Sequence, residues 1–138
     1  MDNPVALASS VSVAYLQGLL DYLERHGVAS AALLERAQLS PQLLAQRDQR
    51  IAASTYLELL GLGVQLSGDD CLGLHLGEAV RPGYYGVLGY LIMSCATLGD
   101  ALHRQARYAV LVGNLGQVEL LDEPPRPGLE AQVAHRWQ

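Results

Sequence analysis

The stretch RPGYYGVLGYLIMSCATLGDALHRQARYAVLV, residues Arg81–Val112, decides how this chain is organised. It holds four of the seven tyrosines and the most marked pair of helical signals in the sequence. A Pro-Gly pair near its start predicts a turn, and the apolar residues that follow predict a buried helix over 84–94. Thr97 and Asp100 stand where an N-cap and a capping-box acid are expected, so a second helix is predicted to begin there. The inward rows of the first helix are expected to be Val87, Leu88, Leu91 and Ile92.

Helical spacing dominates the sequence before this stretch. Apolar residues recur at i, i+3, i+4 and i+7 over Val13–Leu23, with Ser10 or Ser12 as the cap and Gly27 as the stop. Further helices are predicted with Ser30 as cap, after Ser40-Pro41, from Ala53 or Ser54 to Ser67, and over CLGLHLGEAV. The segment RDQRIAAS is interpreted as a polar link. The longest of these helices is expected to bury Leu57, Leu60, Gly61 and Val64.

Strand signals follow residues 81–112. Residues 117–121 and 129–137 are strand-like, and the PPRPG between them predicts a rigid turn. Together they predict an antiparallel hairpin that must pack on other elements, because a lone hairpin is only marginally stable. The expected fold class is α+β, with a mostly helical N-terminal part followed by a short antiparallel β-hairpin or sheet. The chain stops one residue after Trp137, which we interpret as a cut through a longer protein.

Length and charge narrow the class of protein. A chain of 138 residues predicts one domain, and its net charge of −5 is the wrong sign for gripping nucleic acid unaided. All nine basic residues are arginine, which excludes a Schiff-base lysine and a P-loop lysine. No apolar run reaches the roughly 20 residues that cross a bilayer, and the N-terminus lacks the basic residues of a secretory signal. We therefore expect a cytoplasmic protein without a membrane partner.

Residues that could carry catalysis or hold a metal are few. No G-x-S-x-G nucleophile elbow occurs. Cys71 and Cys95 are too few for a disulfide framework and are expected to be small buried residues. Cys71 and His75 could share a helix face, but a zinc site needs three or four ligands. The sequence therefore predicts neither an enzyme nor a metal site, and no cofactor.

A cluster of tyrosines is the feature most typical of a binding site. Hydroxyls on apolar surfaces suit a small-molecule pocket, and an arginine beside a tyrosine could hold a ligand carboxylate. The same rings could instead fill the core of a chain that has no phenylalanine. An enclosed cavity lined by residues 85, 90, 93 and 108 would favour a sensor, whereas a solid core there would favour an interaction module. The candidate ligand-binding residues are Tyr84, Tyr85, Tyr90, Met93, Arg107 and Tyr108.

Three groups of residues carry a resemblance to a known family. They are Gly68-Asp69-Asp70 with Gly73-Leu74 and Leu76-Gly77; Gly86, Gly89-Tyr90, Ser94, Thr97-Leu98 and Ala101-Leu102; and Arg107-Tyr108. With these groups in this order and at this spacing, the chain resembles the N-terminal regulatory domain of AraC/XylS-type bacterial transcription regulators. Asp70 departs from the proline that is common there, which is harmless at a helix start.

The resemblance implies a sensor half. Such domains are attached to a C-terminal helix-turn-helix domain, so residues 1–138 are expected to form a single regulatory domain that meets DNA only through a domain absent from this chain. Such domains bind an effector, dimerise, or both. The expected partners are therefore an unknown small-molecule effector and a second copy in a homodimer. The alternative is a ligand-free module for protein interaction or dimerisation.

Overall fold

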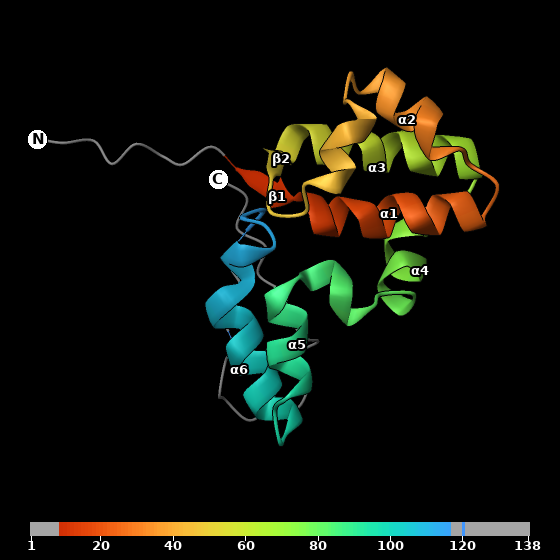
Figure 1. Cartoon of the computed structure of the whole chain (residues 1–138). Coiled ribbons are helices and arrows are strands. Elements are labelled where there is room, and N and C mark those ends of the chain that lie inside the picture. The colour runs from red at the N-terminus through yellow and green to blue at the C-terminus, as the bar shows by residue number, and fades with distance from the viewer. Residues whose placement is uncertain (1–8, 117–119, 121–138) are drawn as a thin grey trace, which may run out of the picture.

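A layer of helices makes up most of the fold, and two short strands run beside it (Figure 1). The computed structural model describes residues 9–116 and residue 120. Its elements are β1 (Ser10–Ser12), α1 (Val13–Arg25), α2 (Ser30–Arg36), η1 (Pro41–Ala45), β2 (Arg50–Ala52), α3 (Ala53–Ser67), α4 (Leu72–Glu78), η2 (Pro82–Tyr85), α5 (Val87–Met93), α6 (Leu98–Tyr108) and η3 (Ala109–Leu111). The expected α+β class is confirmed. The hairpin predicted over 117–137 lies outside the described residues, apart from residue 120.

Helix α1 is the centre of the core. The Ser12 hydroxyl caps it by accepting from the Tyr15 backbone N–H at 3.2 Å, as predicted, and Gly27 takes up a left-handed φ of 82° beyond its end. The apolar stripe of α1 packs against α2, α3, α4 and η2. Its buried leucines are Leu16, Leu19, Leu20 and Leu23. The residues from β1 to α4 are called the helical body below.

Helix α3 has the predicted bounds, and its predicted inward face is only partly right. Leu60 and Val64 pack half-buried against the core, as predicted. Leu57 is 45% exposed, however, and the buried side chains are Tyr56 and Leu59. Apolar residues occur all around α3, so their spacing could not select the inward side. Gly63 selects it: a Cβ there would lie 3.0 Å from Leu23 and from Leu72, so α1 and α4 pack directly over this glycine.

The two strands were missed in the sequence. The segment interpreted as a polar link contains β2, which pairs antiparallel with β1 so that Val11 faces Ile51. At three residues each, the strands are too short to show a period of two. The other edge of β1 is taken by residues 112–114, since the Ser12 N–H donates to the Val112 carbonyl at 2.7 Å. Strand β1 therefore lies between β2 on one edge and residues 112–114 on the other.

Two local predictions near the helix starts were also wrong. Ser30 is the first residue of α2 rather than its cap, and the cap residue Ala29 makes no side-chain hydrogen bond. Residues 82–85 form the separate turn η2, because Gly86 (φ 57°, ψ −137°) interrupts the helix predicted over 84–94. Helix α5 then begins at Val87, which is 73% exposed rather than buried. The predicted Thr97 cap is confirmed by a 3.1 Å bond from the Asp100 N–H.

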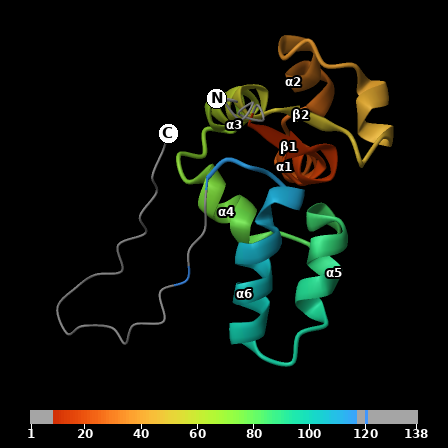
Figure 2. The same cartoon turned by 90° about the vertical axis from the view of Figure 1, so that its left-hand side faces the viewer.

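Helices α5 and α6 pack against each other and project from the helical body (Figures 1 and 2). We call residues 87–108 the helical hairpin. None of the residues of α6 is buried. The helical hairpin is held at two places, by η2 against α1 and by residues 112–114 against β1. This arrangement makes η2 the joint between the helical body and the helical hairpin.

Candidate functional site

Tyr84 lies at the joint, where η2 meets α1. Its ring packs over Gly18, at which a Cβ would stand 3.0 Å from the ring atoms. Its hydroxyl donates to Asp21 Oδ2 at 2.8 Å. Burial of the ring, followed by this hydrogen bond, raises the pKa of the Tyr84 hydroxyl above its ordinary value. The tyrosine therefore stays a neutral donor that fixes the Asp21 carboxylate.

Charged side chains surround this tyrosine. A depression of about 360 Å³ is lined by Asp21, Glu24, Arg25, Arg81 and Tyr84. The only ion pair within 4.0 Å in the described part of the chain joins His75 to Asp69, so no carboxylate of the depression is paired with an arginine. The depression is therefore lined by two carboxylates and two guanidinium groups that form no ion pairs with one another.

Neighbouring groups hold the α1 side of the depression in place. Glu24 accepts a hydrogen bond from the Ser30 hydroxyl at the start of α2. The Arg25 Nε donates to the Asp21 backbone carbonyl at 3.1 Å, within the same helix. The i, i+3 and i+4 spacing of Asp21, Glu24 and Arg25 places all three on one helix face. This spacing is visible in the sequence, but only the fold shows that these three residues lie beside η2.

The other five predicted site residues lie in three separate places. Tyr85 is half-buried and packs on Tyr15, whose ring centroid lies 5.5 Å away. Burial and the neighbouring Tyr15 raise the pKa of Tyr85. Tyr90 and Met93 point outward from α5 and are 66% and 67% exposed. Within the described residues, these side chains form neither one enclosed cavity nor one solid core.

Arg107 and Tyr108 belong to a second depression on the helical hairpin. The Arg107 guanidinium lies 5.6 Å from the centroid of the Tyr108 ring, a geometry suited to a cation–π contact. The second depression has a volume of about 380 Å³ and is lined by Leu91, His103, Arg104, Arg107 and Tyr108. It carries arginines but no carboxylate. Of the six predicted residues, the structure thus brings Arg107 and Tyr108 together and separates Tyr84 from them.

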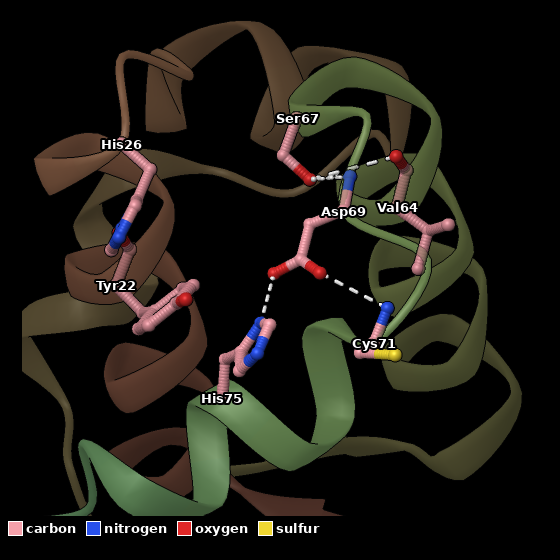
Figure 3. A network of polar contacts seen from close by, with 7 residues as sticks. All are labelled: Tyr22, His26, Val64, Ser67, Asp69, Cys71 and His75. Atoms are coloured by element: carbon pink, nitrogen blue, oxygen red, sulfur yellow. Dashed lines mark hydrogen bonds and ion pairs between the residues drawn. The ribbon is translucent and has the colours of Figure 1, made fainter.

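A third polar cluster joins α3 to α4 (Figure 3). Asp69 accepts from the Cys71 backbone N–H at 3.0 Å and contacts His75 Nδ1 at 2.8 Å. Cys71 is exposed, contrary to the expected burial, while Cys95 is half-buried with its thiol donating to the Leu91 carbonyl at 3.4 Å. Over residues 9–116 and 120, no three His, Cys, Asp or Glu side chains gather as metal ligands would. The cluster therefore fastens α4 to the end of α3.

Residues 27–137 match the family described as the arabinose-binding domain of AraC transcription regulators, N-terminal. The chain belongs to this family. The chain is also 32% identical, over 124 residues, to the ornithine utilization regulator of Pseudomonas aeruginosa. That similarity covers 90% of the chain and 37% of the Pseudomonas protein, so the chain spans little more than a third of its relative's length. None of the helices described in the domain is long and apolar enough to cross a membrane.

Proposed function

We propose that this regulatory domain senses a small-molecule effector in the cytoplasm and controls DNA binding by an attached helix-turn-helix domain. Family membership is the observation that carries the proposal. On this view, the 138 residues are one regulatory domain, and DNA is contacted through a second domain outside this chain. The net charge of −5 agrees with this division, because phosphate binding requires clustered positive charge.

A shift between two arrangements of the domain is the proposed mechanism. The helical hairpin meets the helical body mainly through η2 and residues 112–114. An effector that binds one arrangement of these parts better than another would increase its population. The same free-energy coupling would alter how the attached DNA-binding domains are presented. The effector's differential affinity for the two arrangements sets the limit of the response.

The name of the Pseudomonas relative indicates which ligands to test first. We propose an amino acid as the effector class, with L-ornithine and L-arabinose as contrasting probes. Thermal-shift measurements on the 138-residue chain would also include quaternary amines and fatty acids. A shift of the midpoint by one class identifies the effector class. If no compound stabilises the domain at millimolar concentration, the sensor proposal is wrong.

A ligand-free dimerisation module is the second candidate function, and one observation favours it. Large apolar side chains are unusually exposed on the helical hairpin and the turn after it. They are Val87, Tyr90, Met93, Leu98, Leu102, Tyr108, Val110 and Leu111. Apolar surface that gathers in this way is typical of interaction sites. Sedimentation at several concentrations would show whether a homodimer forms, and a dimer with no ligand response would favour this second function.

A further inference from the structure

We propose that the depression between α1 and η2 binds the zwitterionic backbone of a free amino acid. Arg81 would bind the carboxylate of the ligand. Asp21 and Glu24 would bind its α-ammonium group and a second ammonium group on its side chain, where the ligand has one. This inference rests on the proposed sensing function and gives it a location. The charges carry it, because both signs line one depression without being paired to each other.

Charged side chains without hydrogen-bond partners would keep much of their conformational freedom. Here each of the two carboxylates accepts a hydrogen bond from a hydroxyl group of the protein. The Tyr84 hydroxyl donates to Asp21 at 2.8 Å, and the Ser30 hydroxyl donates to Glu24. Each carboxylate keeps acceptor sites for a further donor, since an ionised carboxylate has about four. Acceptors fixed before the ligand arrives lower the entropy cost of binding.

The arginine across the depression supplies the complementary group. Arg81 is exposed and precedes Pro82, which begins η2. A guanidinium can grip a carboxylate with two parallel N–H donors, a geometry that an ammonium group cannot provide. Arg25 also lines the depression, but its Nε already donates to the Asp21 carbonyl of its own helix. We therefore assign the ligand carboxylate to Arg81.

The depression is shallow and open to solvent, with a volume of about 360 Å³. A ligand there would be bound through its charges rather than by enclosure. The lining is charged rather than apolar, so a ligand with charges of both signs fits better than a fatty acid. Two carboxylates also favour an amino acid with a second ammonium group on its side chain.

The position of this site links binding to regulation. Asp21 and Glu24 belong to α1 in the helical body, whereas Arg81 and Tyr84 belong to the joint that carries the helical hairpin. A ligand bonded to both sides would tie the joint to α1. Its binding free energy would therefore favour the arrangement in which the helical hairpin is held as described here.

Isothermal titration calorimetry on the 138-residue chain tests the site, with L-ornithine as the probe. We expect Arg81→Gln to weaken binding roughly 10- to 100-fold, the loss typical of a hydrogen-bonded charge. Arg104→Gln removes an arginine of the second depression and is the matched control, expected to bind as the parent does. Both arginines are exposed, so neither substitution should unfold the chain, which circular dichroism will verify.

Two ligands that each lack one group complete the test. Putrescine lacks the carboxylate, so its binding should be weak and unaffected by Arg81→Gln. L-norvaline lacks the side-chain ammonium and should bind less tightly than L-ornithine while remaining sensitive to Arg81→Gln. Binding of L-ornithine that is unchanged in Arg81→Gln overturns the site and leaves the sensing function intact, whatever Arg104→Gln does. Stabilisation by sugars or fatty acids alone overturns the ligand class, and no response to any compound overturns both.

Discussion

The carbonyl oxygen of Pro82 occupies the space that a side chain on Gly89 would need, since a Cβ there would stand 1.9 Å from it. Helix α5 thus lies directly on the backbone of η2. We expect Gly89→Ala to destabilise the domain by about 1–3 kcal/mol, because backbone cannot move aside as a flexible side chain can. Urea unfolding followed by circular dichroism measures the change.

Gly61 provides the matched control for that substitution. It lies inside α3, and an added Cβ would meet nothing within 4 Å. Gly61→Ala should therefore stabilise the domain by about 0.5–1 kcal/mol, since alanine favours a helix over glycine by this amount. Equal effects of the two substitutions would contradict the close contact between α5 and η2.

The hydroxyl of Tyr84 is expected to contribute to stability through its bond with Asp21. Tyr84→Phe keeps the ring over Gly18 but removes this donor, and should cost about 1 kcal/mol in the free energy of unfolding. The raised pKa of Tyr84 means that this contribution is complete below the ordinary tyrosine pKa of 10.0 and is lost as the pH rises through the folded-state value. Unfolding curves at pH 7 and at pH 11 should therefore differ less for Tyr84→Phe than for the parent.

His75 should titrate above its ordinary pKa of 6.5, because it is hydrogen-bonded to the Asp69 carboxylate. The pKa of Asp69 is lowered, chiefly by the same bond. The stabilisation that comes from the raised pKa of His75 is thus complete below pH 6.5 and is lost as the pH rises through the folded-state pKa of His75. The stabilisation that comes from the lowered pKa of Asp69 is complete above pH 3.8 and is lost as the pH falls through the folded-state pKa of Asp69. Nuclear magnetic resonance titration of the imidazole in the parent and in Asp69→Asn checks the shift, which should become much smaller in the variant because Asp69 is its main cause. An unchanged imidazole pKa in Asp69→Asn would show that this carboxylate is not the cause.

Arg50 should not be replaceable by lysine. Its guanidinium donates to the Ser10 hydroxyl at 2.8 Å, to the Ser10 carbonyl at 3.0 Å and to the Leu111 carbonyl at 3.0 Å. A lysine ammonium cannot span these acceptors with the same planar fork. Arg50→Lys should therefore cost about 1–2 kcal/mol in the free energy of unfolding. Arg36→Lys on α2 is the control, and equal unfolding midpoints for the two variants would mean that the three bonds contribute nothing.

The sequence predicted helices well where the apolar residues of a helix form a single stripe. Helix α1 has such a stripe, and Ser12, one of the two predicted caps, begins it. Helix α3 is apolar on most sides, so its buried face depended on Gly63 meeting α1 and α4. Strands β1 and β2 are stable only because residues 40 positions apart meet, and no local pattern reports such a pairing.

The candidate site was also predictable only in part from the sequence. Tyrosine and arginine are visible as binding residue types in the sequence, and Tyr84 was named from that argument. Its partner Asp21 lies 63 positions away on α1, so only the fold reveals that the two share a depression. Tyr90 and Met93 were candidates because tyrosine hydroxyls on an apolar surface suit a pocket, but this composition does not distinguish a pocket from an exposed face.

The pairing of β1 with residues 112–114 sets an order of events during folding. Ser10 and Asn114 are bonded across a separation of 104 residues, so this contact closes nearly the whole described chain into a loop. Contacts of such long range form slowly, because loop closure costs entropy before the contact is gained. On the ribosome, α1 to α4 can assemble as soon as they emerge. The second attachment of α5 and α6 must wait until Asn114 has been synthesised and has returned to a strand made about a hundred residues earlier.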